Sequence, residues 1–250
     1  RSWADYVMVD SHFEFPEYPL KHGCPGGLPM VNFPEITMWG RYPWGGSGAN
    51  PLPERFERIW RQAADKLDGG FPYSEGIYED MNKAAISQFY WKKSSSAMET
   101  MREYVAYEFG AAAVEPVLEA IQLLEATYPS ANCNGYESAA SGGERRSTPE
   151  AIDRAYALLT GVDATLTNRA ASSWRWRILY LRALIDYEKL HNNGAATERC
   201  NDAFEELERI YAAEGAGGPV SPKSRRTMAR LTRLATPKPD SEIPGAIQPA

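Results

Sequence analysis

The stretch Gly69–Trp91, GGFPYSEGIYEDMNKAAISQFYW, decides how this chain is organised. It opens with two glycines and an aromatic–proline pair, which interrupt helices. Apolar residues return at helical spacing from Ile77 onward, so the stretch predicts a β-type run around 71–73 followed by a helix. Between the two lies Ser-Glu-Gly at 74–76, where a carboxylate beside a glycine can project into a cleft with little steric cover.

Two interpretations of Glu75 are open. An acid at the start of a helix interacts favourably with the positive end of the helix dipole, and such acids are common there. A carboxylate at the carboxyl end of a strand can instead be catalytic, because the active sites of parallel α/β proteins collect at these ends. Spacing alone favours the electrostatic role.

Upstream of this stretch, β-type runs alternate with loops rich in glycine and proline. Residues 5–10 and 28–33 are the two runs, and each ends in polar or ionisable side chains. Asp10 and His12 follow the first run, and Glu35 follows the second. Apart from these runs we expect residues 1–50 to form loops and no helix.

The remainder of the chain is predicted to be almost entirely helical. Apolar spacing predicts helices over 51–66, 97–109, 112–128, 148–161, 165–190 and 195–214. The helix over 165–190 is apolar on most sides, which is typical of a central bundle helix, and Arg182 is expected to pair with Asp186 four residues later.

The fold class predicted is therefore α/β followed by all-α, helix-dominated overall. Residues 1–92 form the β/α part, 97–214 a helical bundle, and 215–250 an extended Pro/Gly-rich tail. The first part contains at most three β-type runs. An eight-stranded (β/α) barrel needs roughly 250 residues, so this part alone cannot close one.

Composition excludes several classes of function. The 250 residues are 43% hydrophobic and 24% charged, as in globular proteins, and contain no apolar run of membrane-helix length. A net charge of -6 and the absence of a basic arm argue against nucleic-acid binding. The three cysteines are widely separated, without the spacing of a zinc site. We expect no metal and no cofactor.

Aromatic residues are concentrated in the loops of the first part. Trp39 and Trp44 lie in a glycine-rich loop, and Tyr73 ends the third β-type run. Such rings offer flat apolar faces of the kind on which sugars stack, while packing in the core is the alternative for each of them.

The order of these features resembles the closing section of certain glycoside hydrolases, the α-N-acetylglucosaminidase and α-glucuronidase families, which have a (β/α)8 barrel and a mostly helical C-terminal domain. Residues 74–76 with Asn82 and Trp91 resemble a "PEG…N…Y…W" motif that carries a catalytic glutamate in the first family. Asn32-Phe33 with Trp39-Gly40 resembles its "HNFGG" loop, although Pro34-Glu35 replace the glycines. The match covers about residues 5–110 by motif and the rest by helical character.

The resemblance implies that residues 1–92 are the last strands and helices of an incomplete barrel, completed by a preceding segment or a companion chain. It implies a carbohydrate substrate cleaved by acid/base catalysis with two carboxyl groups. Glu75 and then Glu35 are the catalytic candidates. The candidates for substrate contact are Asp10, His12, Trp39, Trp44, Asn50 and Tyr73. A periplasmic or secreted location is favoured, and a homo-oligomer is left open.

Other classes of function are weighed beside this one. A non-catalytic carbohydrate-binding or scaffolding module is the main alternative. A metal-dependent hydrolase is disfavoured because Asp10 and His12 have no further well-placed histidine. A serine nucleophile is disfavoured because Ser74 lacks the G-x-S-x-G elbow.

Overall fold

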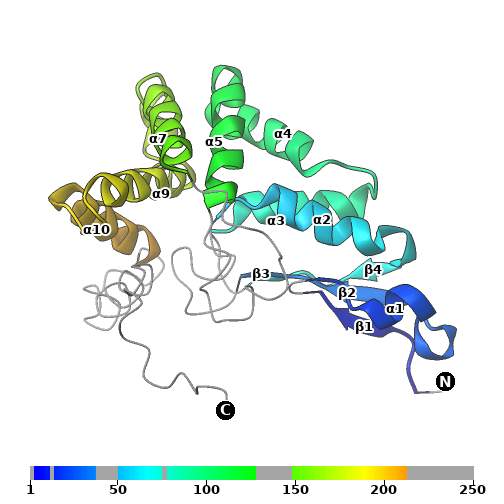
Figure 1. Cartoon of the computed structure of the whole chain (residues 1–250). Coiled ribbons are helices and arrows are strands. Elements are labelled where there is room, and N and C mark those ends of the chain that lie inside the picture. Colours follow the sequence, from blue (N-terminus) through cyan, green and yellow to red (C-terminus); the bar gives the residue numbers. More distant parts are fainter. Residues whose placement is uncertain (1–2, 12–13, 38–49, 75–77, 128–147, 213–250) are drawn as a thin grey trace, which may run out of the picture.

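The computed structural model describes residues 3–11, 14–37, 50–74, 78–127 and 148–212. Its strands are short and parallel (Figure 1). β1 (Val7–Asp10), β2 (Met30–Phe33) and β4 (Gly69–Gly70) form one sheet in that order. β3 (Glu35–Thr37) continues β2 and pairs with β5 (Tyr73–Ser74), which continues β4. Neighbours in the sheet are thus successive along the chain.

Helices connect these parallel strands, as a parallel arrangement requires. α1 (Glu17–His22) and the 3-10 turn η1 (Pro25–Gly27) lie between β1 and β2. α2 (Pro53–Ala63), extended by the 3-10 turn η2 (Ala64–Lys66), precedes β4, and α3 (Asp80–Trp91) follows β5. α2 and α3 lie side by side over one face of the sheet (Figure 1).

The expectation that residues 1–50 contain no helix is wrong at α1. This helix has a single buried residue, Pro19, and Leu20 packs against the core. Proline is tolerated in the first turn of a helix, where its missing N–H has no partner in any case. Gly23, with φ of 72°, ends the helix by donating its N–H to the Pro19 carbonyl.

The rest of the described chain is helical. Its elements are α4 (Ala97–Phe109), the 3-10 turn η3 (Ala111–Ala113), α5 (Val114–Thr127), α7 (Pro149–Asp163), α8 (Asn168–Ala171), α9 (Trp174–His191) and α10 (Glu198–Ala212). α7 packs on both α5 and α9, and α10 packs on α9 (Figure 1). No described helix is both long enough and apolar enough to span a bilayer.

The helix expected over 165–190 is two helices, which corrects that prediction. The Thr167 hydroxyl accepts the N–H of Ala170 and caps α8, which ends after one turn. Ser173 then adopts an extended conformation, with φ of -65° and ψ of 135°, before α9 begins. Serine and threonine side chains compete for backbone hydrogen bonds in this way and favour helix ends over helix interiors.

One hydrophobic cluster runs through the β/α part and the helical part. It includes Val9 and Met30 of the strands, Phe89 of α3, Val117 of α5 and Trp176 of α9. The structure therefore confirms a helix-dominated chain in which short parallel strands precede a set of packed helices. Around this core α4 packs on α2, on α3 and on α5.

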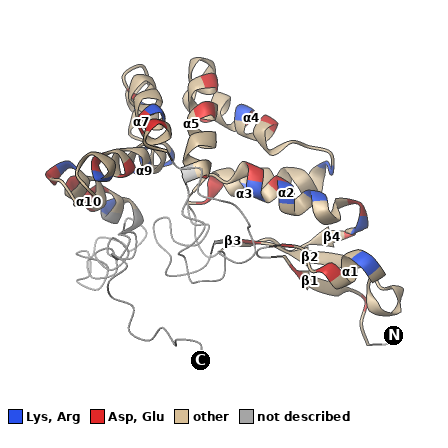
Figure 2. Ribbon diagram, in the orientation of Figure 1, with Lys and Arg blue, Asp and Glu red and all other residues tan. Residues whose placement is uncertain are grey.

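Charged residues lie on the outer surfaces of the helices. Figure 2 shows acidic and basic residues interspersed along α2, α3, α4 and α10. Many of them form ion pairs, such as Arg154 with Glu119 at 2.7 Å. Among the described residues this surface carries no large field of one sign.

Candidate active site

The carboxyl ends of the strands meet at one edge of the sheet because the strands are parallel. Asp10 at the end of β1 is in register with Phe33 at the end of β2. Glu35 at the start of β3 is in register with Tyr73 at the start of β5. The backbone N–H of Tyr73 donates to the Pro34 carbonyl at 2.9 Å, which fixes that register. This edge is the candidate site.

Alternation along the strands decides which side chains face the helices. Met30 and Ile36 lie in the shared core, and Asn32 accepts a hydrogen bond from the hydroxyl of Tyr90 on α3. Successive side chains of a strand point to opposite faces. Phe33 and Glu35 therefore belong to the face of the sheet opposite α2 and α3.

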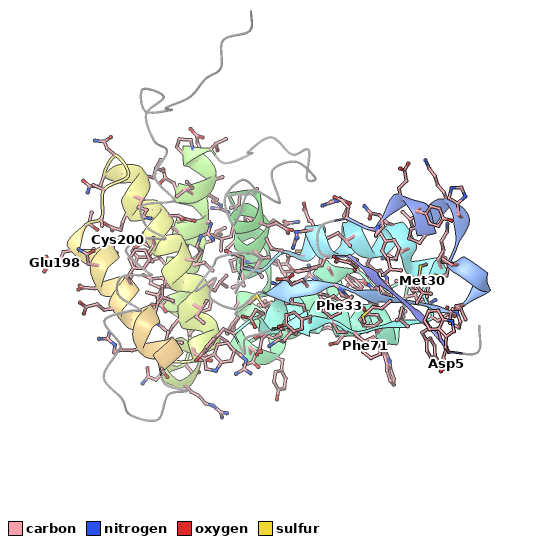
Figure 3. The ribbon with its side chains drawn as sticks, turned by 90° about the horizontal axis from the view of Figure 1, so that it is seen from below. Asp5, Met30, Phe33, Phe71, Glu198 and Cys200 are labelled. Atoms are coloured by element: carbon pink, nitrogen blue, oxygen red, sulfur yellow. The ribbon has the colours of Figure 1, made fainter. Side chains whose placement is uncertain are left out.

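That opposite face carries exposed aromatic and apolar side chains. Tyr6, Met8 and Phe71 are 62%, 58% and 61% exposed. Figure 3, seen from below, shows the strands on the near side of α2 and α3, with Phe33 and Phe71 at the sheet. Within the described ranges no helix covers this face. All-parallel sheets occur almost entirely with both faces covered. A parallel sheet with one face that no described helix covers is therefore unusual.

Glu35 and an aromatic pair lie together at the candidate site. The rings of Phe33 and Tyr73 are 5.5 Å apart and tilted by 30°. Tyr73 is 37% exposed, whereas Glu35 is 8% exposed. A buried carboxyl group next to partly exposed rings combines an apolar surface with a polar group, as small-molecule sites do.

The structure describes only some of the predicted site residues. Asp10 is exposed at the end of β1. Glu75, His12, Trp39 and Trp44 lie outside the described residues. The sequence, however, requires that Glu75 follows Ser74, the last residue of β5. Glu35, Tyr73 and the chain position next to Glu75 are thus brought to one edge.

Asn50 has a different setting from the one expected of a substrate-binding residue. It is 4% exposed, and its side-chain oxygen accepts a hydrogen bond from Arg182 of α9. Its backbone carbonyl accepts from Asn82 at 2.6 Å, and the Asn82 oxygen accepts the Leu52 N–H at 2.9 Å, at the start of α2. We therefore assign Asn50 and Asn82 to holding α2, α3 and α9 together.

A polar group that was not predicted from the sequence lies next to the end of β5. The Ser74 hydroxyl donates to Oε2 of Glu79 at 3.1 Å, and Nζ of Lys83 lies 3.3 Å from the same oxygen. Glu79 is 5% exposed, so this carboxylate is buried and bound from two sides. The i,i+4 spacing of Glu79 and Lys83 was the available signal for the ion pair. The bond to Ser74 had no comparable signal.

A second group missed by the sequence analysis lies where α3, α4 and α9 meet. Nε of Arg175 is 2.6 Å from Oδ2 of Asp80 and 3.4 Å from Oε1 of Glu108. Tyr104 lies beside them, and burial, reinforced by the negative charge of Asp80, raises the pKa of its hydroxyl. The pocket lined by these elements holds about 20 Å³, room for about one water molecule.

Neither a metal site nor a relative identifies the chemistry. In the described part of the chain, no group of three His, Cys, Asp or Glu side chains is arranged to hold a metal ion. No protein-family model, no curated protein and no solved structure matches the chain. The function must therefore be inferred from the residues at the candidate site.

Proposed function

We propose that the chain is part of a glycoside hydrolase and that Glu75 is its principal catalytic carboxylate. The observation that carries the proposal is the register of β3 with β5. It brings the buried Glu35 level with the aromatic Tyr73, two residues before Glu75. Carboxyl ends of parallel strands are where catalytic side chains collect in α/β enzymes.

Glu35 is proposed as the partner carboxyl group. Hydrolysis of a glycosidic bond commonly uses one proton donor and one nucleophile or base. A proton donor must be a carboxyl group that is protonated at neutral pH. Glu35 could serve in this role, or it could accept a hydrogen bond from a sugar hydroxyl, with Glu75 as nucleophile or acid/base.

The aromatic pair is proposed to bind the sugar ring. Phe33 and Tyr73 lie on the same face of the sheet as Glu35, and Tyr73 is partly exposed. Trp39 and Trp44 are proposed to add stacking surfaces, and Asp10 and His12 hydrogen-bonding groups. No cofactor or metal ion is needed for acid/base cleavage of this kind.

Further strands are proposed to complete the sheet into a (β/α) barrel, supplied by a preceding segment or a companion chain. Support comes from the sheet itself. Successive strands are parallel neighbours, and the face opposite α2 and α3 exposes Tyr6, Met8 and Phe71. In a barrel this face would be filled by the side chains of other strands.

The test is hydrolysis of a panel of 4-nitrophenyl glycosides by the full-length protein, its Glu75→Gln variant and its Glu35→Gln variant. We expect Glu75→Gln to lower kcat by about 1000-fold or more with Tm nearly unchanged, because only the reacting group is altered. A Glu75→Gln variant that keeps full activity, or that unfolds, would show that the assignment is wrong.

The alternative is a carbohydrate-binding module without catalysis, which the partly exposed Tyr73 beside Phe33 also supports. In that case the full-length protein would bind glycans, release no product, and bind equally well after Glu75→Gln. Calorimetric titration with oligosaccharides beside the hydrolysis assay separates the two functions.

A further inference from the structure

Tyr156 of α7 lies in a cluster of aromatic side chains on the helical part, where α7 and α10 both pack on α9 (Figure 1). Its ring stacks on that of Tyr187, with centroids 4.3 Å apart and planes tilted by 29°. The ring of Tyr187 is in turn 4.4 Å from that of His191, and the ring of Tyr180 is 6.2 Å from that of Tyr156. Tyr156 is half-buried and His191 is exposed, so reagents in solution can reach this cluster.

Arg199 of α10 is directed at the hydroxyl group of Tyr156. Its Nη2 donates a hydrogen bond to that hydroxyl at 2.7 Å, and its Nη1 donates to Oε1 of Glu188 at 2.6 Å. Glu188 is 9% exposed, and its other oxygen accepts from the Thr197 hydroxyl at 2.7 Å. The guanidinium group is therefore held by a buried carboxylate of α9 and presents its second nitrogen to the phenol on α7. Hydrogen bonds from a charged donor of this kind are among the stronger ones in proteins.

Several hydrogen bonds converge on the phenol oxygen of Tyr156. Although burial raises the pKa of Tyr156, hydrogen bonds from Arg199, Tyr180 and Thr160 and the charge of Arg199 lower it below its ordinary value. Burial and the hydrogen bond to Tyr156 raise the pKa of Tyr180. Donors that bind the charged form of a group favour that form. Of these two tyrosines, Tyr156 therefore loses its proton first, and Tyr180 keeps its own as a donor.

We propose that Tyr156 is a nucleophilic tyrosine, a modification site at which the phenol oxygen, activated by Arg199, accepts a sulfonyl group from an activated aryl donor. A weak nucleophile becomes reactive at neutral pH when its surroundings favour the deprotonated form. The neighbouring rings of Tyr187 and His191 offer flat apolar surface against which the aryl group can lie. The site is on the helical part and does not depend on the proposed glycosidase function.

The reaction is a substitution at sulfur and needs neither an oxidant nor a reductant. The proton of the Tyr156 hydroxyl passes to water, and the phenolate oxygen forms a bond to the sulfur of a sulfonyl fluoride. The bond from sulfur to fluorine breaks, and fluoride leaves with the electron pair. Arg199 acts on this step through Tyr156, because it stabilises the phenolate, and it is a positioning residue.

Exposure alone predicts a different order of reactivity among the tyrosines. Tyr107 of α4 is 88% exposed and Tyr6, before β1, is 62% exposed, whereas Tyr156 is half-buried. If access to the reagent controlled the rate, Tyr107 and Tyr6 would react before Tyr156. Activation by Arg199 reverses this order, and Tyr180 stays unmodified because its raised pKa keeps it protonated.

The experiment treats the full-length protein with benzenesulfonyl fluoride at neutral pH and follows each tyrosine by peptide mass spectrometry. We expect Tyr156 to be labelled at least about 10-fold faster than Tyr107, since each unit by which a pKa is lowered increases the fraction of phenolate about 10-fold. Tyr107 serves as the internal standard for the amount of reagent. Labelling of Tyr156 no faster than that of Tyr107 would overturn the proposal without any variant being made.

Arg199→Gln tests the source of the activation, and Arg154→Gln is the matched control. Arg154 is also exposed and ion-paired, with Glu119, and lies two positions from Tyr156 on the same helix. Arg199→Gln should slow the labelling of Tyr156 about 10-fold relative to Tyr107, because the charged donor is lost. Arg199→Lys, which keeps the charge, should restore part of the rate, and Arg154→Gln should leave it unchanged. Equal rates in the natural protein and Arg199→Gln would overturn the role of Arg199.

Discussion

The guanidinium group of Arg182 donates a hydrogen bond to the side-chain oxygen of Asn50, 132 positions earlier in the chain. Both residues are buried, at 6% and 4% exposed. Arg182 also donates from Nε to Asp186 at 2.7 Å. This arginine therefore connects the middle of α9 to the residues that precede α2, next to the shared core.

Replacing Arg182 by leucine should destabilise the fold strongly. The change removes one donor to Asn50 and the charge that pairs with Asp186. Because Asp186 is 23% exposed, we expect a cost near the lower end of the about 3–5 kcal/mol for breaking a buried ion pair. Urea denaturation measures the free energy of unfolding. Arg154→Leu is the control, because its pair with Glu119 is exposed and should matter little. Equal effects of the two substitutions would contradict the role given to Arg182.

Gly70→Ala should disturb the contact between the sheet and α3, whereas Gly69→Ala should not. A Cβ at Gly70 would lie 2.1 Å from the Tyr90 hydroxyl and 2.2 Å from Oδ1 of Asn32, within the bond between these two groups. A Cβ at Gly69 would meet only Cγ1 of Val31, at 3.7 Å. Overpacking of this kind costs about 1–3 kcal/mol, measurable by chemical denaturation. A Gly69→Ala variant as unstable as Gly70→Ala would refute the steric explanation.

Glu125 should make stability depend on pH. It accepts the N–H groups of Glu54 and Arg55 at the start of α2, at 3.0 and 2.8 Å. Burial raises its pKa to about 7, although these two hydrogen bonds lower it. The folded chain then holds this proton more tightly than the unfolded chain, in which the pKa is about 4.5. The contribution is complete below pH 4.5 and is lost as the pH rises through 7.

The measurement is the free energy of unfolding against pH for the natural protein and for Glu125→Gln. Between pH 4.5 and 7 the natural protein should lose up to about 3 kcal/mol relative to the variant, since one pKa unit corresponds to about 1.36 kcal/mol. Parallel curves across this range would show that Glu125 has an ordinary pKa.

Tyr73→Ala should weaken substrate binding without weakening the fold. Loss of a stacking ring costs about 0.5–1.5 kcal/mol, so KM should rise up to about 10-fold with kcat little changed. Steady-state kinetics on the best aryl glycoside measure it. Tyr107→Ala on α4, where the ring is 88% exposed, is the control. A Tyr73→Ala variant with the natural KM would remove Tyr73 from the proposed subsite.

Local features of the structure could be predicted from the sequence because their signals are local. The alternation of β-type runs with loops predicted β1 and β2, and Phe109 ends α4 at the position expected from Gly110. The run expected around 71–73 is instead two short strands, β4 and β5, on either side of 71–72, and β3 was not predicted. The Arg182–Asp186 pair follows from i,i+4 spacing. α1 was missed because it is short and contains Pro19. The end of α8 was missed because the apolar pattern was given more weight than Ser172 and Ser173, which favour helix ends.

Long-range contacts had no comparable signal. The bonds from Tyr78 to Ile210 and from Arg182 to Asn50 each span 132 positions, and nothing in the spacing of these residues links them. They arise only after the shared core has brought α9 and α10 next to α2 and α3. The candidate site shows the same difference. The strand ends predicted Glu35 and Tyr73, whereas the hydrogen bond from Ser74 to Glu79 had no signal in the sequence.

The face of the sheet that no described helix covers (Figure 1) has a practical consequence for handling the polypeptide. This face exposes the large apolar side chains of Tyr6, Met8 and Phe71. Within the described residues, β1 and β4 each have a single hydrogen-bonded neighbour. Exposed strand edges beside apolar surface are templates for self-association. We expect these 250 residues to self-associate through this face as their concentration rises.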